Sequence, residues 1–320
     1  MDEKVSIIIP VYNAEATIEK CLYSVLNGRY KNIEVIIVND CSTDNSNNIC
    51  SSLRDLDDRV VLINNSHNMG VSKTRNVGLE QVTGKYIMFL DSDDWVESEY
   101  VDMHVTAISK YDVSMAVSGY VNEDLCGTGV TERFGFGKEE VDIPLSFSNE
   151  ALDIFHNRLL QQLWNKIFIA EIIHNNHLFF DESISIGEDF RFILSYVRSA
   201  KNKTLVKLYG YPYHYMRVNK NSLMNSVGKE SIEEQLVNLR LLYESVGMSE
   251  GEICTKIDAE RKVYEDSYAY LIMHNTGMKM KDKRKYILKI SPNKGKSLFW
   301  NNYCLLLKER LRRISSAFVK

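Results

Sequence analysis

The feature that most constrains the fold is a set of short, almost uninterrupted apolar runs in the first third of the chain. These runs are residues 5–9, 33–38, 60–63 and 86–90. The segments between them carry apolar side chains at helical spacing. Strands that are apolar on both faces are typical of parallel sheets with helices packed on each side. The sequence therefore predicts an α/β fold, with a Rossmann-like, mostly parallel sheet covered by helices.

A cluster of acidic residues, Asp91-Ser92-Asp93-Asp94, directly follows the fourth apolar run. Ligands of open α/β sheets bind at the carboxyl ends of the strands. Carboxylates this close together repel one another unless a cation or a proton compensates them. Mg²⁺ typically takes one or two carboxylates together with substrate phosphates. We therefore expect a divalent cation at Asp93, with help from Asp91, although an acidic turn in which Asp94 caps the next helix is the competing interpretation.

Polar residues also follow the other three runs. They are PVYN at 10–13, NDCSTD at 39–44 and NMGVSKTRN at 68–76. In the second, an exposed Asp40 can accept a hydrogen bond from a base edge. In the third, a glycine turn enters a helix, whose N-terminus favours anions. Each segment alone is an ordinary loop, but four such strand ends together indicate a site for a phosphate-bearing ligand.

The composition excludes several classes of protein. With 44% hydrophobic and 26% charged residues, it is that of a globular protein. Six irregularly spaced cysteines indicate neither a zinc site nor a disulfide framework, and free thiols fit a cytoplasmic location. We expect no signal peptide, and no stretch reaches the roughly 18 apolar residues of a membrane span. No G-x-G-x-x-G follows a strand, which argues against a Rossmann dehydrogenase.

Charge is distributed unevenly along the chain. Residues 279–320 hold thirteen Lys and Arg against two acidic residues, whereas the whole chain has a net charge of −4. Residues 298–318 combine aromatic and leucine side chains with basic ones, a pattern that suits an amphipathic helix on anionic lipid. The alternative is a helix packed on the body with a solvated basic face. The segment 252–275 has apolar residues at helical spacing, so we expect it to pack on another helix or on a second subunit of a homodimer.

The motifs at the four strand ends, in this order and spacing, resemble the family 2 glycosyltransferases. The resemblance is strong over residues 4–120 and looser to about 225. It implies the GT-A fold and an inverting transfer from a nucleotide-sugar. It also implies a catalytic domain at 1–225, with a nucleotide-sugar-binding half at 1–120 and an acceptor-side half at 121–225. Residues 226–320 would form a helical C-terminal extension with a basic amphipathic tail.

The resemblance assigns roles to the residues that bind the donor. The nucleobase would lie against Pro10, Val11 and Tyr12, and Asp40 would accept from the uracil N–H. The base, ribose or phosphates would lie near Asn68 and Arg75, and the ribose near Asp91 and Ser92. Mn²⁺ or Mg²⁺ would be held by Asp93 and Asp91 and would bridge the donor diphosphate. Asn39 stands before Asp40 where many relatives have a different pair, which leaves the Asp in place.

The second half would supply the general base and the closing segment. By themselves, Glu188 and Asp189 are two acidic residues in the first turn of a helix, where negative charge interacts favourably with the helix dipole. The resemblance implies that Asp189 is the base and that Glu188 is its support or alternate. Arg217 would clamp a phosphate, since a guanidinium can bind phosphate bidentately. His214 would be a metal ligand, a phosphate contact or simply a packed residue. The sequence leaves two alternatives for each of two further residues: Trp164 stacks on a sugar or belongs to the core, and Lys166 touches the donor or is solvated.

The sequence thus predicts a metal-assisted inverting glycosyltransferase. The donor would be a UDP-sugar, and the acceptor a saccharide, glycolipid or glycoprotein of surface polysaccharide or glycan biosynthesis. We expect no nucleic-acid partner, a cytoplasmic enzyme and a peripheral contact with the inner face of the plasma membrane. A nucleotidyltransferase is the alternative enzyme, although residues 10–16 lack its usual glycine-rich basic loop. A non-catalytic binding module of the same fold is the alternative outside enzymes.

Overall fold

The computed structural model describes residues 3–124, 129–138, 141–184, 186–217, 229–274, 278–291, 297–299 and 301–302. The chain divides into two compact units, Met1–Val218 and Asn219–Lys320. The domain boundary predicted at residues 225–226 falls within 218–228, outside the described residues.

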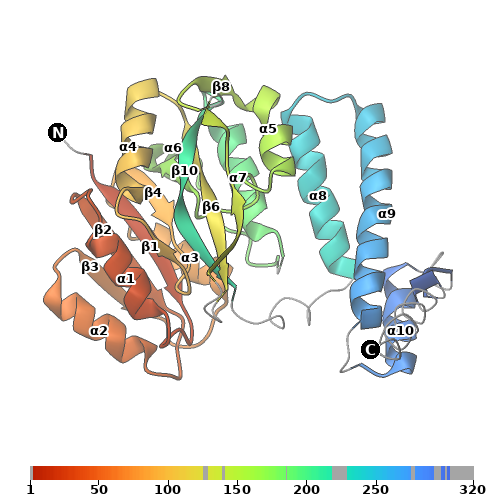
Figure 1. Cartoon of the computed structure of the whole chain (residues 1–320), viewed down its shortest axis with the longest axis horizontal. Coiled ribbons are helices and arrows are strands. Elements are labelled where there is room, and N and C mark those ends of the chain that lie inside the picture. Colours follow the sequence, from red (N-terminus) through yellow and green to blue (C-terminus); the bar gives the residue numbers. More distant parts are fainter. Residues whose placement is uncertain are drawn as a thin grey trace, which may run out of the picture. The chain divides into compact units, whose positions relative to one another are not determined.

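The first unit is built on a sheet with the strand order β3-β2-β1-β4-β9-β6-β10-β5 (Figure 1). Four of these strands run parallel and side by side: β1 (Val5–Val11), β2 (Ile33–Asn39), β3 (Val60–Asn64) and β4 (Tyr86–Phe89). The side chains of β1, β2 and β4 are almost entirely buried. Because the strands are parallel, their carboxyl ends meet at one edge of the sheet.

Antiparallel pairing appears in the second part of the sheet. Strand β9 (Lys166–Ile169) runs antiparallel between β4 and β6 (Met115–Asp124). Strand β10 (Thr204–Arg217) is parallel to β6 and antiparallel to β5 (Trp95–Val96). Two short strands, β7 (Gly129–Phe134) and β8 (Pro144–Ser146), pair with β6 and β10. The predicted α/β fold is confirmed, as a mixed sheet whose parallel run is β3-β2-β1-β4.

Helices surround this sheet. They are α1 (Ile18–Leu26), α2 (Ser46–Leu56), α3 (Val71–Leu79), α4 (Tyr100–Tyr111), α5 (Phe147–His156), α6 (Ala170–Asn175) and α7 (Glu188–Ser199). Helix α3 packs very closely on β1: a Cβ added at Gly78 would lie 2.6 Å from Ile8 Cγ2. A glycine at this point therefore lets the last turn of α3 approach the middle of β1.

The second unit is helical in the part that the structure describes, as predicted. It contains α8 (Lys229–Ser245), α9 (Glu250–His274) and α10 (Met280–Ile290). Helix α9 packs against α8 and α10, and Lys283 of α10 donates to Met273 O at 2.6 Å. Among the described residues, no helix has the length and apolar character to cross a membrane. The amphipathic tail predicted at 298–318 lies almost wholly outside the described residues.

Candidate functional site

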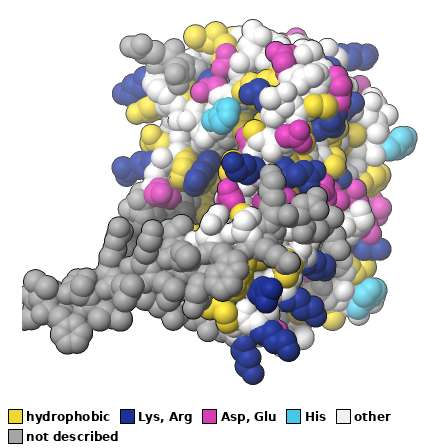
Figure 2. Space-filling model, turned by 90° about the vertical axis from the view of Figure 1, so that its right-hand side faces the viewer, with side chains coloured by type: hydrophobic (Ala, Val, Ile, Leu, Met, Phe, Trp, Pro, Cys, Tyr) yellow, Lys and Arg dark blue, Asp and Glu magenta, His cyan; other side chains and the backbone are white. Residues whose placement is uncertain are grey.

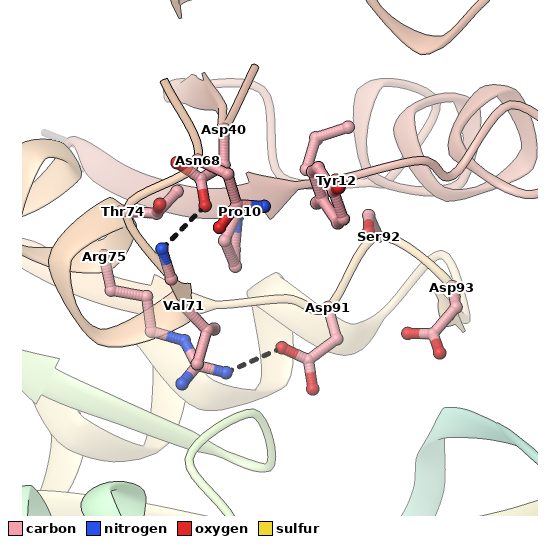
Figure 3. Close-up of a pocket in the computed structure, with 12 residues that line it drawn as sticks. Pro10, Tyr12, Asp40, Asn68, Val71, Thr74, Arg75, Asp91, Ser92 and Asp93 are labelled. Atoms are coloured by element: carbon pink, nitrogen blue, oxygen red, sulfur yellow. Dashed lines mark hydrogen bonds and ion pairs between the residues drawn. The ribbon is translucent and has the colours of Figure 1, made fainter. Parts of the chain in front are cut away.

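A pocket of about 430 Å³ opens at the carboxyl ends of β1, β2 and β4 (Figure 3). Nine of the residues predicted to bind donor or metal line it together: Pro10, Val11, Tyr12, Asp40, Asn68, Arg75, Asp91, Ser92 and Asp93. Three further lining residues had no predicted role, namely Gly70, Val71 and Thr74. They stand at the start of α3, so the glycine turn into that helix was the signal that could have found them.

Asp40 shapes the loop that leads into α3. One carboxylate oxygen accepts from Asn65 Nδ2 at 2.9 Å and from Met69 N at 2.8 Å, and the other accepts from Gly70 N at 2.9 Å. The residue is 3% exposed, so the expectation of an exposed Asp40 was wrong: its carboxylate is buried by the loop that it holds. The next residue, Cys41, has φ 57°, so the chain turns sharply away after β2. Because each carboxylate oxygen has two lone pairs, acceptor capacity remains for a base N–H.

The acidic loop after β4 separates a structural carboxylate from two that face the pocket. Asp94 is 1% exposed and accepts from Tyr213 OH at 2.6 Å and Met216 N at 2.7 Å. It therefore ties the loop to β10 and does not cap a helix, since α4 begins only at Tyr100. Asp91 and Asp93 line the pocket. Burial, followed by repulsion from Asp91, raises the pKa of Asp93 to about 6.

Arg75 joins the donor pocket to the predicted base. From α3, its Nη2 donates to Asp91 Oδ1 at 2.9 Å and its Nη1 to Asp189 Oδ1 at 2.7 Å. Glu188 Oε1 lies 3.7 Å from Nη1. Burial opposes a charged guanidinium, but the carboxylates outweigh it and raise the pKa of Arg75. The predicted donor contact at Arg75 is thus, in this structure, a bridge between two acidic residues 98 positions apart in the sequence.

Asp189 stands in the first turn of α7, after Gly187 with φ 86°. Burial is the largest influence on it and raises the pKa of its carboxyl to about 7, although Arg75 acts in the opposite direction. A carboxylate whose pKa lies near neutrality is well matched to general base catalysis. The pair Glu188-Asp189 is therefore more than a complement to the helix dipole, since Asp189 is held in place by a buried cation.

His214 lies outside the group of residues that line the pocket. Its Nδ1 is 2.7 Å from Glu123 Oε1 and its Nε2 is 3.0 Å from Glu97 Oε1. The ring stacks on Trp95, with the centroids 3.5 Å apart. The side chain of Arg217, the predicted phosphate clamp, is outside the described residues, although β10 ends at that position.

Burial decides between the alternatives stated for Trp164 and Lys166. Trp164 is 5% exposed and stacks on Tyr213 at 4.0 Å, so it belongs to the core. Lys166 is fully buried and donates to three acceptors, Leu159 O, Gln162 O and Asn165 Oδ1. Both predictions for Lys166 were therefore wrong: it neither lines the pocket nor meets solvent. It fixes the loop before β9, and burial lowers its pKa well below the usual value.

The acidic residues of the pocket fit a divalent cation that is shared with a ligand. Within the described residues, no three His, Cys, Asp or Glu side chains group as ligands for one ion. Mg²⁺ is typically bound through one or two carboxylates and substrate phosphates, so a complete protein cage is not needed. A cation would relieve the repulsion between Asp93 and Asp91 that raises the pKa of Asp93.

Comparison with known proteins decides the family. The glycosyl transferase family 2 model matches residues 6–168, about half of the chain. The chain belongs to glycosyl transferase family 2. This is the family that the motifs predicted.

The relatives of this family 2 enzyme cover different parts of it. It is 43% identical to glycosyltransferase GlyA of Streptococcus pneumoniae over 120 residues. These 120 residues are 38% of this chain and 17% of GlyA. It is 31% identical over 242 residues to the uncharacterized glycosyltransferase EpsJ of Bacillus subtilis, 72% of this chain and 66% of EpsJ. The chain thus spans from about a sixth to two thirds of the length of these curated relatives.

A solved structure shares the fold. The S. aureus TarS 1-349 structure in complex with UDP-GlcNAc has a TM-score of 0.61 and 20% sequence identity, covering 94% of this chain and 89% of that chain. This likeness confirms the GT-A fold that the motifs predicted.

Proposed function

We propose that this family 2 enzyme transfers a sugar from a UDP-sugar to a hydroxyl of a saccharide, glycolipid or glycoprotein acceptor, with inversion at the anomeric carbon. The observation that carries the proposal is the Arg75 guanidinium, which holds Asp91 of the donor pocket and Asp189 at once. An acid on each side of one buried cation supports a donor site and a base that serve a single reacting centre.

The donor side of the proposal is supported by the pocket. Tyr12 is 49% exposed and lines the pocket beside Pro10, so its ring offers a surface for a nucleobase. The first turn of α3, with Gly70 and Val71 in the pocket wall, offers backbone N–H groups to a phosphate. TarS, which shares the fold, has been crystallised with UDP-GlcNAc, which is why we name uridine diphosphate as the carrier.

Asp93, with Asp91, would hold Mn²⁺ or Mg²⁺, which would supply positive charge to the departing diphosphate. Asp189 would accept the proton of the acceptor hydroxyl as that oxygen attacks the anomeric carbon, and Glu188 would support it. A positioned carboxylate contributes typically about 10²–10⁴-fold to such a step. Arg75 would favour the ionised form of Asp189. In this proposal residues 1–225 are the catalytic domain, and residues 226–320 are its helical extension.

The acceptor would be presented at a membrane surface, on the inner face of the plasma membrane. Helix α10 supports this part of the proposal because it carries five Lys and Arg residues and one acidic residue. Figure 2 shows Lys and Arg side chains beside hydrophobic ones in the lower part of the face in view. A homodimer and the roles of His214 and Arg217 stay predictions.

The donor and the metal are tested together by thermal stabilisation. UDP, GDP, CDP and dTDP are each added with Mn²⁺ and with EDTA. A ligand at a hundred times its Kd adds about 2.7 kcal/mol, which is readily seen in Tm. We expect a rise with UDP that is lost in EDTA and in Asp93→Asn. The exposed surface variant Asp55→Asn should keep the rise.

Transfer is tested with UDP-sugars and saccharide acceptors. Asp189→Asn should retain the nucleotide-dependent rise in Tm and lose turnover by about 10²–10⁴-fold. Unchanged turnover in this variant would remove Asp189 as the base. A response to another nucleotide would change the donor, and no response to any nucleotide would favour a non-catalytic binding module.

A further inference from the structure

Asn76, the neighbour of Arg75 on α3, binds the backbone of a segment more than a hundred residues away. Its Oδ1 accepts from Phe180 N at 2.7 Å and its Nδ2 donates to Phe180 O at 3.0 Å. The amide also donates to Glu182 Oε1 at 3.3 Å. Asn76 is 7% exposed and Phe180 is 2% exposed. A buried side-chain amide that satisfies both polar groups of one residue fixes the place and the direction of the chain there.

Phe180 is connected to α7 through the core as well as along the chain. Its ring stacks on Phe192 of α7, with centroids 4.2 Å apart and planes 4° apart. It also meets the edge of Phe89 from β4 at 5.5 Å. The Arg75 Cζ atom lies 5.5 Å from the centroid of the Phe180 ring. Holding Phe180 therefore restrains the helix whose first turn carries Asp189.

Two adjacent residues of α3 thus act on the same target from two sides. Arg75 contacts the carboxylate of Asp189, and Asn76 holds the segment that leads into α7. A third contact, Lys73 to Glu182 at 3.4 Å, is about half exposed on both sides. Such surface pairs contribute little to stability. The buried amide is therefore the stronger of the two connections between α3 and this segment.

We propose that Asn76 is a positioning residue for the general base, holding Phe180 against α3 so that Asp189 meets the guanidinium of Arg75. The inference rests on the proposed function, in which Asp189 takes the acceptor proton. Asn76 is not among the residues that line the donor pocket. Its loss should therefore act on the chemical step and leave donor binding almost unchanged. A misplacement of about 1 Å at a reacting group can cost about 10²-fold in rate.

The test compares Asn76→Ala with a control that removes a buried polar contact at the opposite end of the strands. The control is Ser6→Ala, because Ser6 is fully buried, donates to Glu34 and accepts from Gly84 N at 2.9 Å. In Asn76→Ala we expect kcat to fall by about 10- to 100-fold with the donor KM within about twofold. Ser6→Ala should lower Tm and keep kcat.

Amide hydrogen exchange supplies a readout that does not depend on activity. In the full chain, Asn76→Ala should speed exchange in peptides that cover residues 178–189 and leave β1 unchanged. Unchanged exchange there, unchanged kcat, or an equal loss of kcat in Ser6→Ala would each overturn the inference. Absence of sugar transfer by the unmodified enzyme would count against the proposed function, while the exchange measurement would still decide whether Asn76 holds the segment.

Discussion

At the scale of single residues, the pH dependence of turnover follows from the surroundings of Asp189. Burial is the main reason that its pKa is raised to about 7; Arg75 and Lys166 oppose the rise, and Glu188 and Asp91 add to it. A general base must be ionised, so kcat/KM, which reports the free enzyme, should fall as the pH drops through about 7. Removing the cation in Arg75→Gln should raise the pKa and move the acid limb of the kcat/KM profile to higher pH.

The control for this prediction is Lys73→Gln, which removes one positive charge from the same helix at a side chain that is 46% exposed. It should leave the acid limb in place, because exposed charges are screened by solvent and salt. Arg75→Lys keeps the positive charge but cannot contact Asp91 and Asp189 in the same way. It should therefore shift the acid limb of the pH profile less than Arg75→Gln does. A profile that is the same in Arg75→Gln and the unmodified enzyme would contradict the role given to this guanidinium.

Glu34 gives a prediction about stability. Burial alone would raise its pKa, but hydrogen bonds from Lys4, Ser6 and Thr83 outweigh that effect and lower it to about 2. The carboxylate thus contributes about 3 kcal/mol of unfolding free energy. This contribution is complete above a pH of about 4.5 and is lost as the pH falls toward 2. Urea unfolding should show Glu34→Gln less stable at pH 7, with a difference that shrinks by pH 3.

The matched variant for Glu34 is Glu99→Gln, whose carboxylate is 42% exposed and lies 3.8 Å from Arg29. It should change the unfolding free energy by less than about 1 kcal/mol, as exposed ion pairs do. If the difference between Glu34→Gln and the unmodified protein were the same at pH 7 and pH 3, the ionised carboxylate would not be its source.

The sequence predicted individual residues well where a motif and a strand end coincide. Asp91, Asp93 and Asp40 were placed in the pocket because each follows an apolar run, and parallel strands bring such ends together. Lys166 was misread because its three acceptors belong to the fold around it and leave no pattern in the sequence. For the same reason the bond between Arg75 and Asp189, 114 residues apart, was not foreseen.

At the scale of elements, the close contact between α3 and β1 gives a test of packing. An alanine at Gly78 would place its Cβ 2.6 Å from Ile8 Cγ2, a distance that forces the helix or the strand to move. Overpacking of this kind costs typically about 1–3 kcal/mol. We expect Gly78→Ala to lower the urea midpoint and to weaken nucleotide-dependent stabilisation, because α3 carries part of the pocket wall.

Gly251 of α9 is the control glycine, since a Cβ added there meets nothing within 4 Å. In a helix, replacing glycine by alanine at such a position gains about 0.4–1 kcal/mol. Gly251→Ala should therefore raise stability slightly and leave nucleotide binding unchanged. Gly78→Ala with full stability would show that α3 can shift away from the sheet without cost.

The elements themselves were predictable to different degrees. The parallel strands β1 to β4 were expected from their apolar runs, and all four are present in the described fold. The antiparallel strand β9 was not expected as a strand, because four residues are too few to show alternation. Strand β5 has only two residues and depends on its pairing with β10. Short strands that complete a sheet are defined by their neighbours more than by their own sequence.

At the scale of the whole molecule, the separation of charge along the chain gives a prediction about membranes. Residues 279–320 carry thirteen Lys and Arg against two acidic residues in a chain of net charge −4. On α10, four basic side chains, Lys281, Arg284, Lys285 and Lys289, are exposed at helical spacing, and Tyr286 among them is 45% exposed. A basic surface with aromatic side chains suits the headgroup region of an anionic bilayer.

Co-sedimentation with vesicles of phosphatidylcholine alone, and of phosphatidylcholine with an anionic lipid, measures this binding. Each Lys or Arg near such a surface contributes about 1 kcal/mol, so reversing Lys281, Arg284 and Lys285 to Glu should weaken binding by roughly a hundredfold or more. The control reverses Lys31, Lys201 and Lys262, which are exposed at scattered positions, and should weaken binding far less. Binding should also decline as salt is raised, because the attraction acts within a Debye length. An equal loss of vesicle binding in the two triple variants would mean that net charge alone attracts the enzyme to lipid. No binding to anionic vesicles would leave α10 as a solvated helix and would place the acceptor away from the bilayer.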